Sequence, residues 1–137
     1  MTSQERPIKK FVFSKNKGIG YKTVNVLSNN EVIKCIVFKD GVIYGVGTNG
    51  YFISIDTDLL PKEINTMTSR ELRSMYIVSE SNLFVGGGIY EGSNDFRQHS
   101  GIILGTIDGG ESWHSTKFPK AINKIEMYDS NNGYAIS

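Results

Sequence analysis

The sequence predicts an all-β fold built from repeated groups of short antiparallel strands. Short apolar and β-branched runs alternate with Gly, Asn, Asp and Ser turns along most of the chain, which is typical of strands joined by tight turns. Residues 83–87 repeat the pattern of residues 43–47 about forty residues later, a spacing typical of proteins made of repeated sheets. The 15 glycines and the 39% hydrophobic content fit a turn-rich β-protein.

The first part of the chain is expected to lie outside the regular repeats. Residues 1–7 are polar and predict a frayed end. Residues 11–13 and the alternating segment 21–27 predict two strands. We therefore expect residues 10–31 to supply outer strands that pair with a distant repeat.

Residues 32–71 are predicted to form the first full repeat. Residues 32–38 are apolar and β-branched, which suits an inner strand buried on both faces. Asp40 and Gly41 predict a tight hairpin turn before a second strand at 42–46. A third strand is predicted at 51–55.

Residues 72–121 are predicted to repeat this layout, with an insertion at 89–100. Residues 122–137 begin a further copy. The strands of these two segments are predicted at 75–78, 83–87, 101–107, 114–118, 125–128 and 134–136.

The segment that follows the third strand of the second repeat runs Thr-Ile-Asp-Gly-Gly-Glu-Ser-Trp, from Thr106 to Trp113. Asp108 can accept hydrogen bonds from backbone amides of its own turn, as short Asx side chains do. Gly110 can adopt a positive φ without a steric cost, and Ser112 can close a second side-chain-to-backbone bond. Trp113 enters the next strand and can bury a large apolar area. These residues predict a structural turn.

This segment fits Ser/Thr-x-Asp-x-Gly-x-Ser/Thr-Trp at every position and resembles the Asp-box, or BNR repeat. The resemblance implies a β-propeller of four-stranded antiparallel blades, with the box between the third and fourth strands of a blade. A degenerate copy begins at Ser54 and Asp56, where Leu60 and Pro61 replace the last two pattern residues. The structural box residues are Thr106, Asp108, Gly110, Ser112 and Trp113.

Residues 1–137 are thus expected to form one partial propeller of about two and a half blades, whereas closed propellers typically have four to eight. The chain could be a fragment of a longer propeller, could close a ring with other copies, or could have its edges covered by another protein. A small β-sandwich is the alternative outside this family. We expect a protein partner in the form of remaining blades, a second copy or another subunit.

The best candidate for a ligand site is the insertion at 89–100. In propellers of this kind the loop between the second and third strands lies on the face opposite the box turns, where ligands usually bind. Its aromatic, charged and amide side chains could stack on and hydrogen-bond a sugar or a peptide. An interface loop and a plain solvated loop are the alternatives. The candidate residues are Tyr90, Glu91, Asn94, Asp95, Phe96, Arg97 and His99.

Several other chemistries are disfavoured. Residues 45–50 match GxGxxG, but strand-like residues follow where a dinucleotide site needs a helix. Cys35 is the only cysteine, so no intrachain disulfide is possible. It lies in an apolar predicted strand, so we expect it to be a small core residue. His99 and His114 have no evident third ligand, so neither a metal nor another cofactor is expected.

The charge and hydropathy of the chain give no support for a nucleic-acid or membrane partner. A formal net charge of +1 gives no argument for nucleic acid, and no apolar run is long enough to span a membrane. No signal-peptide pattern is evident, which favours a cytoplasmic or virion-associated location. The Lys, Asn and Ile content is compatible with a bacterial or phage origin.

We therefore expect a non-enzymatic binding or structural module that recognises protein, or glycan, through its loop face. The alternative is a fragment of a sialidase-like glycoside hydrolase. Arg6-Pro7-Ile8 does not match the Arg-Ile-Pro order of those enzymes, and no carboxylate pair stands out.

Overall fold

The computed structural model describes residues 8–13, 22–27, 31–90, 100–129 and 131–137. This part of the chain is all-β, as the sequence predicted, and has twelve strands in four antiparallel sheets. Within the described residues no helix is long and apolar enough to cross a membrane.

Two of the sheets have four strands, and each is a simple meander in which neighbours along the chain are hydrogen-bonded. The first consists of β3 (Ile33–Lys39), β4 (Val42–Gly47), β5 (Phe52–Ile55) and β6 (Pro61–Glu63). The second consists of β7 (Glu71–Ile77), β8 (Leu83–Gly88), β9 (Gly101–Thr106) and β10 (His114–Phe118).

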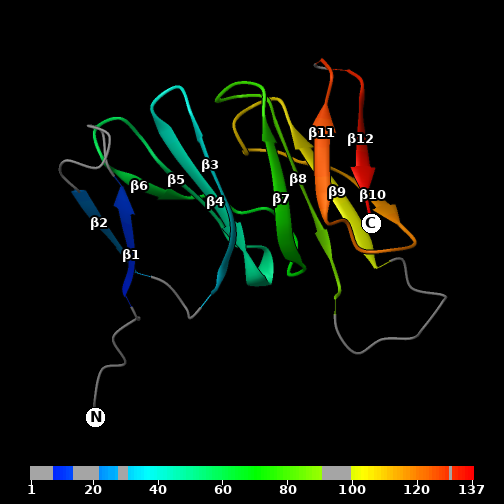
Figure 1. Ribbon diagram of the computed structural model, residues 1–137, viewed down its shortest axis with the longest axis horizontal. Coiled ribbons are helices and arrows are strands. Elements are labelled where there is room, and N and C mark those ends of the chain that lie inside the picture. Colours follow the sequence, from blue (N-terminus) through cyan, green and yellow to red (C-terminus); the bar gives the residue numbers. More distant parts are fainter. Residues whose placement is uncertain (1–7, 14–21, 28–30, 91–99, 130) are drawn as a thin grey trace, which may run out of the picture.

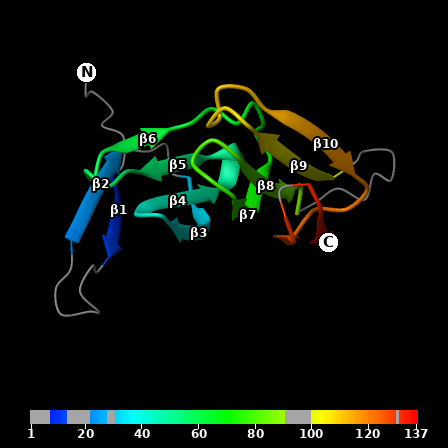
Figure 2. The same cartoon turned by 90° about the horizontal axis from the view of Figure 1, so that it is seen from above.

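The other two sheets are hairpins at the ends of the described chain. One pairs β1 (Ile8–Phe13) with β2 (Lys22–Leu27), and the other pairs β11 (Lys124–Met127) with β12 (Gly133–Ile136). The four sheets stack in chain order, with the β1–β2 hairpin at one end and the β11–β12 hairpin at the other (Figure 1). Seen from above, β3 and β7 lie along one side of the stack, and β6 and β10 lie along the other (Figure 2).

The main core lies between the two four-stranded sheets. Because successive side chains of a strand point to opposite faces, Val42, Tyr44 and Val46 of β4 face the second sheet. They meet residues such as Leu83 and Val85 of β8, which are almost fully buried. A smaller core on the opposite face of the first sheet joins it to the β1–β2 hairpin. It contains Phe11, Ile43, Tyr51, Ile53 and Ile55.

Two glycines allow the first and second strands of each sheet to approach closely. A Cβ on Gly47 would lie 1.9 Å from the carbonyl oxygen of Val32, and one on Gly87 would lie 1.9 Å from that of Glu71. Both positions therefore exclude any side chain. Close approach of a neighbouring backbone is a common reason for glycine within a strand.

The structure corrects one expectation about the inner strand of the first repeat, which is not buried on both faces. Cys35 and Val37 of β3 pack against the main core, but Ile36 and Phe38 on the opposite face are 59% and 64% exposed. The apolar run reflects two apolar faces, of which only one is covered within the described chain.

The short strand β6 was not predicted, because Pro61 is disfavoured in strands except at their ends or edges, where it lies here. Residues 48–50 form a 3-10 turn that leads into β5, which confirms the strand predicted at this position.

Candidate functional site

The turn between β9 and β10 is held by the side chain of Asp108. Its Oδ1 atom accepts hydrogen bonds from the Ser112 amide at 2.9 Å and from the Thr106 hydroxyl at 2.7 Å. The Ser112 hydroxyl donates to Oδ2, and the Gly110 amide donates to the Thr106 hydroxyl oxygen at 2.9 Å. Gly109 and Gly110 both have positive φ values. The predicted structural role of these residues is consistent with this geometry.

These hydrogen bonds lower the pKa of the Asp108 carboxyl to about 2, with the Ser112 hydroxyl as the largest cause. The Ser112 amide and the Thr106 hydroxyl act in the same direction. All three donors favour the ionised form. Both carboxylate oxygens accept hydrogen bonds within the turn, so Asp108 is a poor candidate for a general acid or base.

In the turn between β5 and β6, the side chain of Asp56 likewise binds backbone amides, with fewer hydrogen bonds than Asp108 has. Oδ1 of Asp56 accepts the amides of Asp58 at 2.9 Å and of Leu60 at 3.0 Å. Asp56 and Asp108 thus each bind the amide of the residue four positions later, in the loop before the fourth strand of a four-stranded sheet. The two carboxylates occupy equivalent structural settings.

Trp113 links the second sheet to the first. Its indole Nε1–H donates to the carbonyl oxygen of Asn65 at 2.9 Å, and its ring centroid lies 6.0 Å from that of Phe52. The side chain is only partly buried at the margin of the main core. It closes the outer part of the junction between the two sheets.

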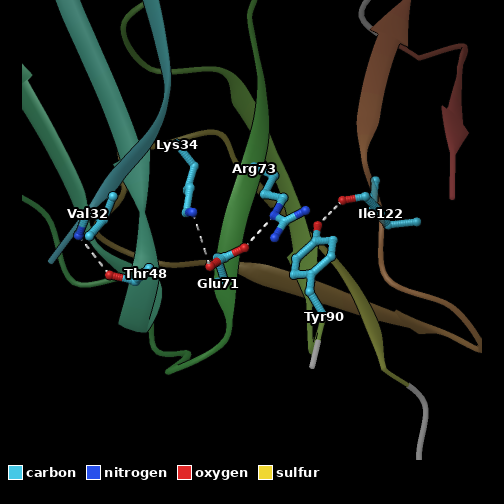
Figure 3. A network of polar contacts seen from close by, with 7 residues as sticks. All are labelled: Val32, Lys34, Thr48, Glu71, Arg73, Tyr90 and Ile122. Carbon is cyan, nitrogen blue, oxygen red and sulfur yellow. Dashed lines mark hydrogen bonds and ion pairs between the residues drawn. The ribbon is translucent and has the colours of Figure 1, made fainter. Parts of the chain in front are cut away.

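A polar network lies at the base of the insertion, at the other end of the second sheet (Figure 3). Glu71 of β7 pairs with Arg73 on the same strand and lies 4.0 Å from the Lys34 ammonium of β3. The Arg73 guanidinium lies over the Tyr90 ring, 3.6 Å from its centroid. The Tyr90 hydroxyl donates to the carbonyl oxygen of Ile122. The network therefore joins both four-stranded sheets to the segment before β11.

The network positions Tyr90 without activating it. Desolvation by burial raises the pKa of Tyr90 to about 12, although Arg73 opposes this effect. A phenol that stays protonated at neutral pH and donates to a backbone carbonyl is a poor nucleophile. The contacts of Tyr90 with Arg73 and with the Ile122 carbonyl hold this residue at the start of the insertion.

Of the seven candidate ligand residues, the structure places only Tyr90. Glu91, Asn94, Asp95, Phe96, Arg97 and His99 lie outside the described residues. Sequence reasoning did not identify the network next to Tyr90, in which Arg73 lies over its ring and Glu71 links Arg73 to Lys34. These charged residues alternate with more buried residues along β3 and β7, which marks them as lying on one face of each strand. The sequence does not indicate that the two strands are neighbours.

The described residues contain no group of three or more His, Cys, Asp or Glu side chains arranged to hold a metal ion. His114 lies exposed on β10, while His99 is outside the described part. Cys35 is partly buried, and burial raises the pKa of its thiol. The thiol therefore stays protonated and is a poor nucleophile at neutral pH.

Comparisons with known proteins give no relative from which a site could be transferred. No protein-family profile, no curated protein and no solved structure matches the chain.

Proposed function

We propose that the chain is a segment of an Asp-box β-propeller that acts as a non-enzymatic binding module. Its binding face is the end of the stack that carries Tyr90 and the insertion at 89–100. The partner we favour is a protein surface, since the network beneath this face presents both signs of charge beside an aromatic ring.

One observation carries this proposal: the same unit recurs in space. Two four-stranded meanders pack face to face, and each has an aspartate-bound turn before its fourth strand. The first strands β3, β7 and β11 are neighbours in the stack. Radial repetition of four-stranded sheets around their first strands is the propeller architecture.

The position of the binding face follows from strand direction. The insertion begins after the end of β8, and the box turn follows the end of β9. Because these two strands are antiparallel neighbours, the insertion and the box turn lie at opposite ends of the sheet. The box end serves to brace the fold, which leaves the insertion end for recognition.

A displayed library of random peptides and an array of sialylated and neutral glycans test the proposal. We expect selected peptides to lose at least about tenfold in affinity with Phe96→Ala or Arg97→Ala, which change the insertion. Glu111→Ala, an exposed change in the box turn, is the matched control and should leave affinity unchanged.

Three outcomes would count against the proposal. Peptides whose binding depends on the box turn would place recognition at the wrong end. Binding confined to the glycan array would replace the protein partner by a carbohydrate. Hydrolysis of a fluorogenic sialoside by the purified chain would favour the enzyme alternative.

A further inference from the structure

The two end hairpins have the form of complementary halves of one four-stranded sheet. In the described part, β11 is the one strand that pairs with β12, and β2 is the one strand that pairs with β1. Among the described residues, each hairpin therefore has a strand edge with no partner strand, which favours pairing with another strand. Whether the hairpins match depends on which strands of a complete sheet each of them represents.

The β11–β12 hairpin corresponds to the first two strands of the second sheet. In the β7–β8 turn, the amides of Val78 and Ser79 both donate to the carbonyl oxygen of Asn82. In the β11–β12 turn, the amides of Tyr128 and Asp129 donate in the same way to that of Asn132. This equivalence aligns β12 with β8, so that residues 133–136 correspond to residues 83–86.

The β1–β2 hairpin corresponds to the third and fourth strands. Residues 14–21 lie outside the described part, but their sequence has Ser14, Asn16 and Gly18 at the spacing of Thr106, Asp108 and Gly110. The strands β2 and β10 begin at the same position after this pattern. The alignment places β1 on β9.

The packing of β1 agrees with this alignment. Phe11 aligns with Ile103, which faces away from the first sheet towards the side on which β11 packs. Phe11 likewise faces the next sheet along the chain, where it packs against Ile53 and Ile55. Val12 points to the opposite side and is exposed.

We propose that two copies of the chain assemble head to tail, with β12 of one copy pairing antiparallel with β1 of the other to complete a four-stranded sheet. The inference rests on the proposed propeller architecture. The β8–β9 register pairs Phe84 with Gly105 and Gly86 with Ile103. Transferred to the junction, it pairs Ala135 with Val12 and Ile136 with Phe11.

Exposed apolar side chains gather on the two surfaces that this assembly would join. Of the eleven large hydrophobic side chains that the described part exposes, seven lie there. At one end these are Val12, Ile36 and Phe38, and at the other they are Ile107, Tyr128, Tyr134 and Ile136.

The register places these groups against each other. Tyr134 and Ile136 point away from the second sheet, because their neighbour Ala135 pairs with Ile125, which packs onto that sheet. In the assembly they face Ile36 and Phe38 of the partner copy. Val12 of the partner then covers the hollow on the second sheet that Phe84, Ile103 and Ile107 line.

The number of copies follows from the sheet count. The described part of each copy has two four-stranded sheets and two hairpins, and in the proposed assembly the hairpins combine with those of the partner into shared sheets. Two copies therefore give six sheets, whereas three copies would give nine. Propellers typically have four to eight blades, so the two-copy ring is the closed form within that range.

Sedimentation equilibrium of the chain over a range of concentrations tests the stoichiometry, and we expect twice the monomer mass of 15.2 kDa. Phe38→Glu should raise the dissociation constant of the dimer at least about tenfold, because it buries an unpaired charge in the junction. Leu60→Glu is the matched control, since Leu60 is 62% exposed against 64% for Phe38 but lies outside the junction.

Cysteine cross-linking tests the register. In a Cys35→Ser background, Val12→Cys with Ala135→Cys places directly opposed residues within the Cα separation that a disulfide spans. We expect oxidation to give a covalent dimer and no larger species. Lys10→Cys with Ala135→Cys is the control, because its diagonal separation of about 7–8 Å is too long for efficient bridging.

Each remaining outcome overturns the inference. A monomer at all concentrations would exclude self-assembly, and a ladder of larger cross-linked species would indicate an open filament. Equal cross-linking of the two cysteine pairs would refute the register. A folded monomer that still selects insertion-dependent peptides would leave the proposed binding function standing, so the two proposals fail separately.

Discussion

Replacing Trp113 with alanine tests whether the residues that follow the β9–β10 turn link the second sheet to the first. Full truncation of a buried Trp costs about 3–5 kcal/mol, and the partly buried position of Trp113 indicates the lower end of that range. We therefore expect the free energy of unfolding to fall by about 3 kcal/mol. Loss of the contact with Phe52 and of the hydrogen bond to Asn65 both contribute.

The assay is urea unfolding followed by circular dichroism, because Trp113 is the only tryptophan and its replacement removes the fluorescence signal. All variants are compared at one protein concentration, since association would shift the unfolding midpoint. Trp113→Phe retains a ring but loses the N–H donor, and should cost only about 1 kcal/mol. A loss below about 0.5 kcal/mol for the alanine variant, within the range of ordinary surface changes, would refute the role of the indole as a link between sheets.

Three further perturbations have defined outcomes. The folded-state pKa of Asp108 is lowered to about 2, so its stabilisation is complete above about pH 4 and is lost as the pH falls towards 2. Asp108→Asn should weaken this acid dependence in thermal melts, and an unchanged dependence would contradict it. Gly87→Ala should destabilise by about 3 kcal/mol, whereas Gly105→Ala, whose Cβ would meet only the Phe84 ring at 3.2 Å, should cost less. Tyr90→Phe should speed amide exchange at residues 89–90 through loss of the bond to Ile122, and unchanged exchange there would argue against anchoring.

The strand pattern was predictable because it is local. Turn residues between short apolar runs located eleven of the twelve strands, with boundaries that differ by a few residues. The exception is β6, which follows the degenerate copy of the aspartate turn and begins at Pro61. No local pattern marks it as a strand, and it is defined by its pairing with β5. The side-chain bonds of Asp108 were also predictable, since every partner lies within four residues.

The candidate site was predictable only in part. Tyr90 was identified by composition, but its contacts with Arg73 and Ile122 join residues far apart in the chain. Nothing local in the sequence indicates that these residues meet. The exposed face of β3 was not predictable either. Phe38 is a large apolar residue of the type found in cores, but no sheet covers it in the described chain.

The sequence by itself determined the alternation of strands and turns and the aspartate-bound turn, because these depend on bonds between residues a few positions apart. Only the tertiary structure decided how the sheets stack, which faces stay uncovered and where the indole of Trp113 docks. Those features arise from burial of apolar surface between distant segments, which is non-directional and carries no local signature. The stacking order in turn decides that β1–β2 and β11–β12 lie at opposite ends of the described stack (Figure 1), each without a further partner strand there.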